Sequence, residues 1–177
     1  MDLREEIIQV SCEKIEEANR ILRMNDHSSI PQAEFEFSTR VSKVSGCAKA
    51  RIFDTYPKRT ISSPVLRFNL KAAESNREVF LKQTVAHEVA HLMSYVLGSK
   101  GHDDVWKDCC RKLGIEPKRC SSYVLEGYIR YTCRCGKTFQ ITPKMDKKIG
   151  LGKEKYTCAK CHGEIYREDP IDKAVMI

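Results

Sequence analysis

The feature that most constrains this chain is a pair of histidines four residues apart in TVAHEVAHLMSY, at positions 84–95. Side chains at i and i+4 share a face of an α-helix, so His87 and His91 can reach one ion if this stretch is helical. Apolar residues recur at helical spacing around the motif, and Gly98 follows as a natural C-cap. The sequence therefore predicts a helix over 75–97 whose buried stripe is Leu81, Val85, Val89, Leu92 and Val96.

The same helix carries the groups that zinc-dependent hydrolysis needs. Imidazole nitrogens suit zinc, and Glu88 lies next to the first histidine, where it can meet a metal-bound water without being a ligand. Because zinc lowers the pKa of that water to about 7, Glu88 can accept its proton during attack on a peptide carbonyl. The alternative is a chance match on a surface helix, and the clean apolar stripe argues against it.

A catalytic zinc takes three protein ligands and keeps one position open. Outside the motif the histidines are His27, His102 and His162. We expect His102 to be the third ligand, because a short glycine-containing turn after the helix can fold it back toward the ion. Residue 97, six positions after the second motif histidine, is leucine, which argues against the metzincin class. Carboxylates that compete with His102 for the third position are Asp103, Asp104 and Glu116.

The residues around this helix predict an α+β fold. An amphipathic pattern indicates an N-terminal helix, alternating patterns indicate three strands, and a further helix should follow the glycine-containing turn. In that helix Trp106 is expected in the core, where it would turn His102 inward. After residue 123 the composition changes to Cys, Lys and Tyr. The expected elements are helices over 2–24 and 103–113 and strands over 33–41, 49–53 and 64–70.

Four of the nine cysteines form two tight pairs near the C-terminal end. Cys133-x-Cys135 and Cys158-x-x-Cys161 bracket 22 residues, a spacing typical of a closed, structural zinc site. The segment between them has few large apolar residues, so metal binding would supply much of its folding free energy. Free buried cysteines are the alternative, and His162 is a substitute ligand. We therefore expect two Zn²⁺ ions per chain.

The positive charge of the chain is concentrated in this cysteine segment. The formal net charge is +7, and residues 128–168 contain ten Lys/Arg and four Asp/Glu, a net of +6. Cations interleaved with aromatic rings favour binding to a single nucleic-acid strand, whereas an ordinary solvated face, with the rings packing a small core, is the alternative. The expected contacts are Arg134, Lys137, Lys144, Lys147, Lys148, Lys153, Lys155, Lys160, Phe139 and Tyr156.

Membrane and secretory classes are disfavoured by the sequence. The chain has no run of 18 apolar residues, and its first 22 residues are acidic early and lack the apolar region of a signal peptide. We expect an intracellular monomer with no membrane partner, located in the nucleus if the source is eukaryotic and in the cytoplasm or nucleoid otherwise.

These residues together resemble the SprT-like family, which includes Spartan and the SprT-like domains of germ-cell nuclear acidic proteins. The matching stretches are RFNL (67–70), TVAHEVAHLMSY (84–95), GHDDVWKDCCRKLG (101–114), CSSY (120–123) and the cysteine ribbon. The resemblance implies that His87, His91 and His102 bind the catalytic zinc and that Glu88 is the base. Two departures are Asp103, where the family commonly has glycine, and the short Cys-x-Cys pair.

The resemblance also implies a function. We expect a zincin-like metalloprotease core, with an N-terminal helix, a small antiparallel sheet, the HExxH helix and a further helix. This zinc metalloendopeptidase would digest proteins bound or crosslinked to DNA, with single-stranded or junction DNA as the partner. The alternatives are a catalytically idle nucleic-acid-binding scaffold and a DNA-independent intracellular zinc peptidase. The expected divisions are the core at 1–125, the basic zinc ribbon at 126–168 and a short tail at 169–177.

Three further predictions concern the substrate. The strand at 66–70 would border the active helix and pair with an extended substrate through backbone hydrogen bonds. Tyr123 would donate a hydrogen bond to the oxyanion, although packing at a helix end is the simpler role for this ring. Asn69 is a further candidate for contact with the oxyanion or the substrate.

Overall fold

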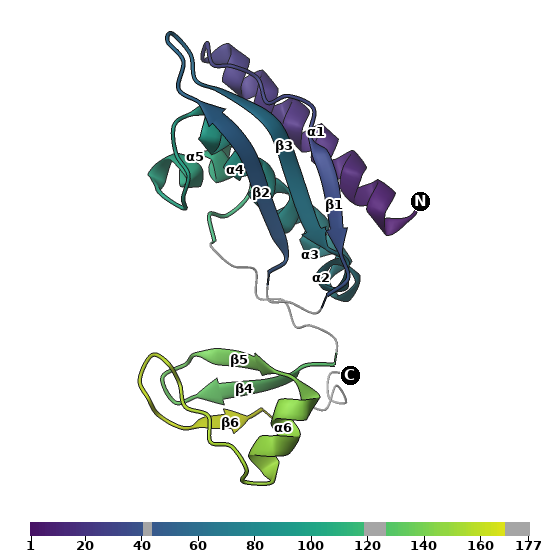
Figure 1. Cartoon of the computed structure of the whole chain (residues 1–177), viewed down its shortest axis with the longest axis vertical. Coiled ribbons are helices and arrows are strands. Elements are labelled where there is room, and N and C mark those ends of the chain that lie inside the picture. Colours follow the sequence, from purple (N-terminus) through teal and green to yellow (C-terminus); the bar gives the residue numbers. More distant parts are fainter. Residues whose placement is uncertain (41–43, 119–126, 169–177) are drawn as a thin grey trace, which may run out of the picture. The chain divides into compact units, whose positions relative to one another are not determined.

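The computed structural model describes residues 1–40, 44–118 and 127–168. The chain divides into two compact units, 1–123 and 124–177, and each contains a three-stranded sheet (Figure 1). Several helices belong to the first unit, and one helix, α6, is described in the second. The α+β class is as predicted, while the predicted domain boundary at 125/126 and the tail lie outside the described residues. Among the described helices, none combines the length and the apolar character that crossing a bilayer would require.

The first unit begins with α1 (Leu3–Met24), close to the predicted limits. Three strands, β1 (Glu34–Ser38), β2 (Gly46–Phe53) and β3 (Thr60–Asn69), then form the sheet. The remaining elements are α2 (Leu70–Ser75), α3 (Arg77–Val79), the π-helical turn η1 (Phe80–Thr84), α4 (Val85–Val96) and α5 (Asp104–Lys112).

The sheet has the order β1-β3-β2, with β3 in the middle. β2 and β3 pair antiparallel, but β1 runs parallel to β3, so the expectation of an antiparallel sheet was wrong. The reason is that β2 and β3 are consecutive and fold back on each other, while β1 joins the other edge of β3. This order also corrects the prediction that the strand at 66–70 pairs with the substrate, because both edges of β3 are already paired. The edge strand next to α4 is β2.

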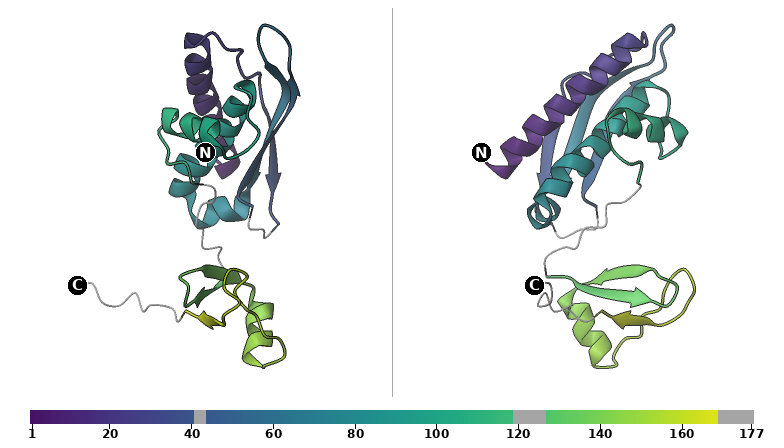
Figure 2. Two further views of the ribbon diagram at one scale, coloured as in Figure 1. Left: turned by 90° about the vertical axis from the view of Figure 1, so that its left-hand side faces the viewer. Right: turned by 180° about the vertical axis from the view of Figure 1, so that it is seen from behind.

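The helices α1 and α4 lie together on one face of this sheet, as the two views in Figure 2 show. The predicted stripe of α4 is buried, with Val85, Val89 and Leu92 fully enclosed. The single helix predicted over 75–97 is interrupted, because Asn76 has a non-helical backbone and η1 widens the following turn. Phe80 at the start of η1 is buried and packs edge-to-face on Phe68 at 5.9 Å.

The second unit is built around β4 (Ile129–Cys133), which pairs antiparallel with both neighbours. These neighbours are β5 (Thr138–Ile141) and β6 (Ile165–Arg167). The basic helix α6 (Pro143–Gly150) lies between β5 and β6 in the chain and was not predicted. Its start was readable from the sequence, because the Thr142 side chain accepts from the Met145 N–H as an N-cap and proline occupies the first turn.

Candidate metal centres and active site

Three histidines converge in the first unit. The Nε2 atoms of His91 and His102 are 3.2 Å apart, and those of His102 and His87 are 3.3 Å apart. A tetrahedral zinc with bonds of ~2.0–2.1 Å would separate two nitrogen ligands by ~3.3–3.4 Å. Two of the three pairs of ring nitrogens therefore already have the spacing of zinc ligands, and the three together can hold one metal ion.

His102 reaches this position through the turn between α4 and α5. Gly98 has φ of +98°, which an L side chain rarely adopts, so the chain can reverse directly after α4. Asp103 then fixes the start of α5, because its carboxylate accepts from the Ser99 hydroxyl at 2.7 Å and from the Trp106 N–H at 3.1 Å. Asp103, which departs from the family pattern, thus stabilises the turn that carries His102 as an N-cap.

Trp106 forms the floor of the histidine cluster. It is fully buried, and its ring centroid lies 4.8, 5.4 and 4.4 Å from those of His87, His91 and His102. Trp106 therefore limits the orientations open to all three rings, in agreement with its predicted core position.

The electrostatic environment keeps two of these rings neutral. Burial, followed by the charge of His102, lowers the pKa of His87 to about 4, although a hydrogen bond with the Lys118 backbone opposes the shift. Burial, followed by the other two histidines, lowers the pKa of His91 to about 3. The Nδ1 atom of His91 is buried without a hydrogen-bond partner among the described residues. Neutral imidazoles carry the lone pair that a metal needs, so burial favours metal binding here.

Glu88 lies against the edge strand β2. Its side chain is buried, with 5% exposed. Burial raises the pKa of Glu88 to about 8, and a hydrogen bond with the backbone of Ala48 opposes the increase. A carboxyl group on the residue that follows His87, largely shielded from bulk water, is suited to hold and release a proton.

Tyr95 belongs to the same site but was missed by the sequence reasoning. Its hydroxyl donates to the Ala48 carbonyl at 3.1 Å, and its ring lies 6.2 Å from that of His91. The signal was present, because Tyr95 follows His91 by four residues on the same helix face. A groove of about 450 Å³ runs beside it, lined by Ala48, Lys49, Ala50, Ile52, Tyr95 and Lys100.

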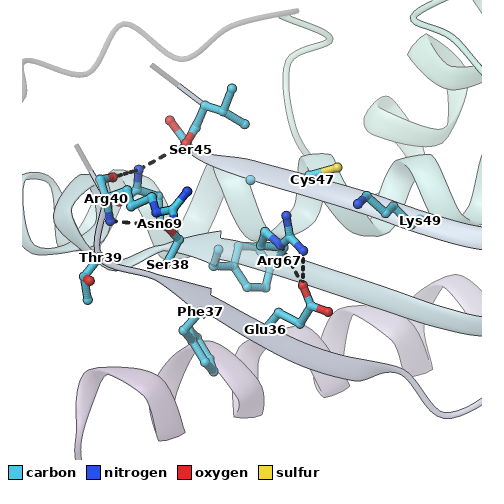
Figure 3. Close-up of a pocket in the computed structure, with 13 residues that line it drawn as sticks. Glu36, Phe37, Ser38, Thr39, Arg40, Ser45, Cys47, Lys49, Arg67 and Asn69 are labelled. Atoms are coloured by element: carbon cyan, nitrogen blue, oxygen red, sulfur yellow. Dashed lines mark hydrogen bonds and ion pairs between the residues drawn. The ribbon is translucent and has the colours of Figure 1, made fainter. Parts of the chain in front are cut away.

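The two residues predicted to contact substrate have different outcomes. Asn69 is 4% exposed, and its Nδ2 donates to the carbonyls of Arg40 and Val44 (Figure 3). Its Oδ1 caps α2 by accepting from the Lys71 N–H. These bonds give Asn69 a structural role beside a cavity of about 790 Å³ on the outer face of the sheet, so contact with substrate stays a prediction. Tyr123 lies outside the described residues.

Four cysteines converge in the second unit. The Sγ atoms of Cys133 and Cys161 are 3.4 Å apart, and those of Cys135 and Cys158 are 3.7 Å apart. Zinc–sulfur bonds of ~2.3 Å would place tetrahedral ligands ~3.8 Å apart, so the cluster fits one metal ion. The short Cys-x-Cys pair closes through Gly136, whose φ is +80° and whose N–H donates to the Cys133 carbonyl at 2.8 Å.

Backbone groups around Cys158 favour its thiolate, whereas hydrogen bonds with the neighbouring thiols of Cys133 and Cys135 raise the pKa of Cys161. Burial raises the pKa of Cys158, but hydrogen bonds from the backbone N–H groups of Lys160 and Cys161 and from neighbouring thiols outweigh it, and the pKa falls to about 6. The Lys160 N–H lies 3.4 Å from the Cys158 sulfur. His162, the predicted substitute, is not part of the cluster of four cysteines.

The side chains predicted to contact nucleic acid divide into those that already have a partner within the protein and those without a described ion pair. Lys148 and the Tyr156 hydroxyl both bind Glu154, Lys137 lies 5.6 Å from the centroid of the Phe139 ring, and Arg134 stacks on Tyr166. The remaining cations are exposed and form no ion pair with the residues that the structure describes. They are Lys144, Lys147, Lys153, Lys155 and Lys160.

Comparison with known proteins identifies the family of the first unit. The family model described as SprT-like family matches residues 12–125. Protein SprT of Pseudomonas aeruginosa (strain LESB58) is 35% identical over 120 residues, covering 59% of this chain and 72% of the relative. Protein SprT of Pseudomonas entomophila (strain L48) is 36% identical over 106 residues, covering 55% and 64%. No solved structure gives a significant match. This chain belongs to the SprT-like family.

Proposed function

We propose that this chain is a zinc metalloendopeptidase of the His-Glu-x-x-His type, with a zincin-like core, that cleaves proteins bound or crosslinked to DNA. The observation that carries the proposal is the convergence of three histidine Nε2 atoms, 3.2–3.3 Å apart for the two closest pairs, beside a buried glutamate. An ion held there by His87, His91 and His102 would be zinc, whose Lewis acidity activates water for attack on an amide. The donor set supports this identity, since three imidazole nitrogens suit zinc better than calcium or magnesium.

Glu88 is the proton carrier in this proposal. Its carboxylate accepts a proton from the attacking water and delivers it to the amine that leaves when the peptide bond breaks. The backbone of β2 lies against this buried carboxylate and restricts bulk water near it, which strengthens its electrostatic interactions. Substituting glutamine preserves the size of the side chain and removes its ability to take a proton.

An extended substrate would bind along β2. β2 is the edge strand nearest α4, and extended peptides pair with such edges through backbone hydrogen bonds that select little by side chain. The Ala48 backbone is already bound to Glu88 and Tyr95, so pairing would use the following residues, next to the groove at Lys100. Methylating individual backbone nitrogens of a peptide substrate should raise KM at the positions that pair with β2. Unchanged KM throughout the peptide would contradict this binding mode.

The cysteine unit is the part of the chain that binds DNA in this proposal. Five exposed lysines without a described ion pair favour contact with phosphates, and the ring of Phe139 favours base stacking. Single-stranded or junction DNA offers unpaired bases to such rings, whereas a duplex does not. Tethering to DNA raises the local concentration of the peptidase near DNA-bound proteins, which explains how broad sequence tolerance can serve crosslink repair.

One experiment separates this proposal from a DNA-binding scaffold and from a DNA-independent peptidase. A DNA-binding protein is incubated with the wild-type chain or Glu88→Gln, with zinc, in the presence and absence of single-stranded DNA. We expect cleavage that DNA stimulates and that Glu88→Gln abolishes. No cleavage by the wild type would favour the scaffold, and cleavage at equal rates without DNA would favour the simple peptidase.

A further inference from the structure

The carboxyl group of Glu88 occupies space that a side chain at Gly46 would need. A Cβ built at Gly46 would lie 2.7 Å from both Cγ and Oε1 of Glu88 and 3.0 Å from its Cδ. Carbon atoms in van der Waals contact are ~3.5–4.0 Å apart, so these distances are strongly repulsive. Any residue other than glycine at position 46 therefore competes with the side chain of Glu88.

Backbone conformation does not account for this glycine. Gly46 is not among the residues with positive φ, and it pairs with Phe68 in the regular register of β2 and β3. Alanine could adopt this extended backbone without strain. The contact with Glu88 is thus the described feature that requires glycine at this position.

The neighbouring residue on the same side of β2 completes the enclosure. Ala48 holds the Glu88 carboxylate through its backbone hydrogen bond, and its carbonyl accepts from the Tyr95 hydroxyl at 3.1 Å. Tyr95 and Glu88 both belong to α4, so two side chains of this helix are hydrogen-bonded to the backbone of one residue of β2.

We propose that Gly46 is a positioning residue, and that the bare Cα of Gly46 and the backbone of Ala48 together fix the carboxylate of Glu88 beside the three histidines. A side chain at position 46 displaces this carboxylate and leaves the histidines in place, because none of them is among the atoms nearest to the built Cβ. The catalytic consequence rests on the proposed function, whereas the contact itself does not.

The contact is tested by a double-mutant cycle on thermal stability, with Gly46→Ala, Glu88→Ala and the double variant. Removing the carboxylate leaves room for the new methyl group, so Gly46→Ala should lower Tm by roughly 3–8 °C alone and by much less in the Glu88→Ala background. Equal decreases in both backgrounds would overturn the proposal. If Gly46→Ala alone does not fold, recovery of folding in the double variant is the same coupling. Gly150→Ala is the control, since nothing lies within 4 Å of its built Cβ.

The positioning role is tested on the zinc-loaded enzyme. We expect Gly46→Ala to lower kcat by roughly 10–100-fold, with KM and the zinc content unchanged, and to have no further effect on Glu88→Gln. Full kcat in Gly46→Ala, or loss of zinc along with activity, would show that the glycine does not position the base. Should the wild type hydrolyse no peptide, the proposed function fails, and the stability cycle still decides whether Glu88 requires Gly46.

Discussion

In both candidate metal-ligand clusters of this chain the ligand atoms lie within 4.8 Å of one another, but different structures hold them in place. The histidines project from α4 and from the turn before α5, and they pack against Trp106, which is fully buried. In the second unit the buried apolar side chains among described residues 127–168 are Tyr131, Cys133, Ile141 and Cys158. Two of these four are themselves candidate ligands. From this comparison we expect the protein core to build the first site and a bound metal ion to build the second.

The largest expected effect is the loss of structure in the second unit when one thiolate is removed. Structural zinc binding contributes ~10–16 kcal/mol in small zinc modules, so Cys158→Ser should unfold residues 127–168 and leave the first unit folded. Amide NMR spectra and zinc content per chain measure both outcomes. The matched variant is His91→Ala, which should lose one zinc and keep both units folded. Unfolding of the first unit by His91→Ala would contradict the claim that the protein core holds the first site in place.

Glu88→Gln should have the next largest effect. Removing a general base typically slows a reaction ~10²–10⁴-fold, because the attacking water no longer has a proton acceptor. Zinc content should remain at two per chain, since glutamine fills the same space and the ligands are untouched. Peptide hydrolysis rates and metal analysis check the two parts. Full activity of Glu88→Gln would show that Glu88 is not the proton acceptor, although the histidines could still bind a metal.

Sequence reasoning succeeded where ligands are close in the chain. His87 and His91 are joined by one helical turn, His102 follows after one glycine-containing turn, and each cysteine pair is separated by one or two residues. Local geometry therefore predicts most of both clusters, and the family resemblance supplies the roles. The structure places the three histidines in one group and the four cysteines in another, and each group could hold a metal ion.

Features that depend on distant pairing could not be read in the same way. The order of the strands decides that β2, not β3, flanks Glu88, and this order follows from contacts between segments far apart in the sequence. The roles of Gly46, Ala48 and Tyr95 depend on it. The ion pair between Lys148 and Glu154 likewise requires the turn after α6, so charge counting alone overestimated the free cations.

Trp106→Ala would sharpen the claim that the core builds the first site. Truncating a fully buried tryptophan costs ~3–5 kcal/mol of the free energy of unfolding, and here it also frees three histidine rings. We expect weaker zinc binding at the histidines and unchanged binding at the cysteines, measured by competition with a chelator. Phe80→Ala is the matched control, because Phe80 is equally buried in the same unit but packs on Phe68. If both variants weaken zinc binding at the histidines equally, general destabilisation explains the result and Trp106 has no special role in positioning the three rings.

The smallest expected effect distinguishes two adjacent lysines of α6. Lys147 is exposed and has no ion pair with a described residue, whereas Lys148 binds Glu154. Each phosphate contact contributes ~0.7 to the slope of log K against log salt for a single strand, so Lys147→Ala should reduce the slope by about that amount. Lys148→Ala should reduce it less, because Glu154 already offsets the charge of Lys148. Fluorescence anisotropy with a labelled single strand at several salt concentrations measures both slopes. Equal slopes for the two variants would mean that the ion pair opens on binding, and two unchanged slopes would move the DNA surface away from α6. Neither outcome bears on whether the cysteine unit requires a metal to fold, so the salt slopes test what that unit binds separately from what stabilises its fold.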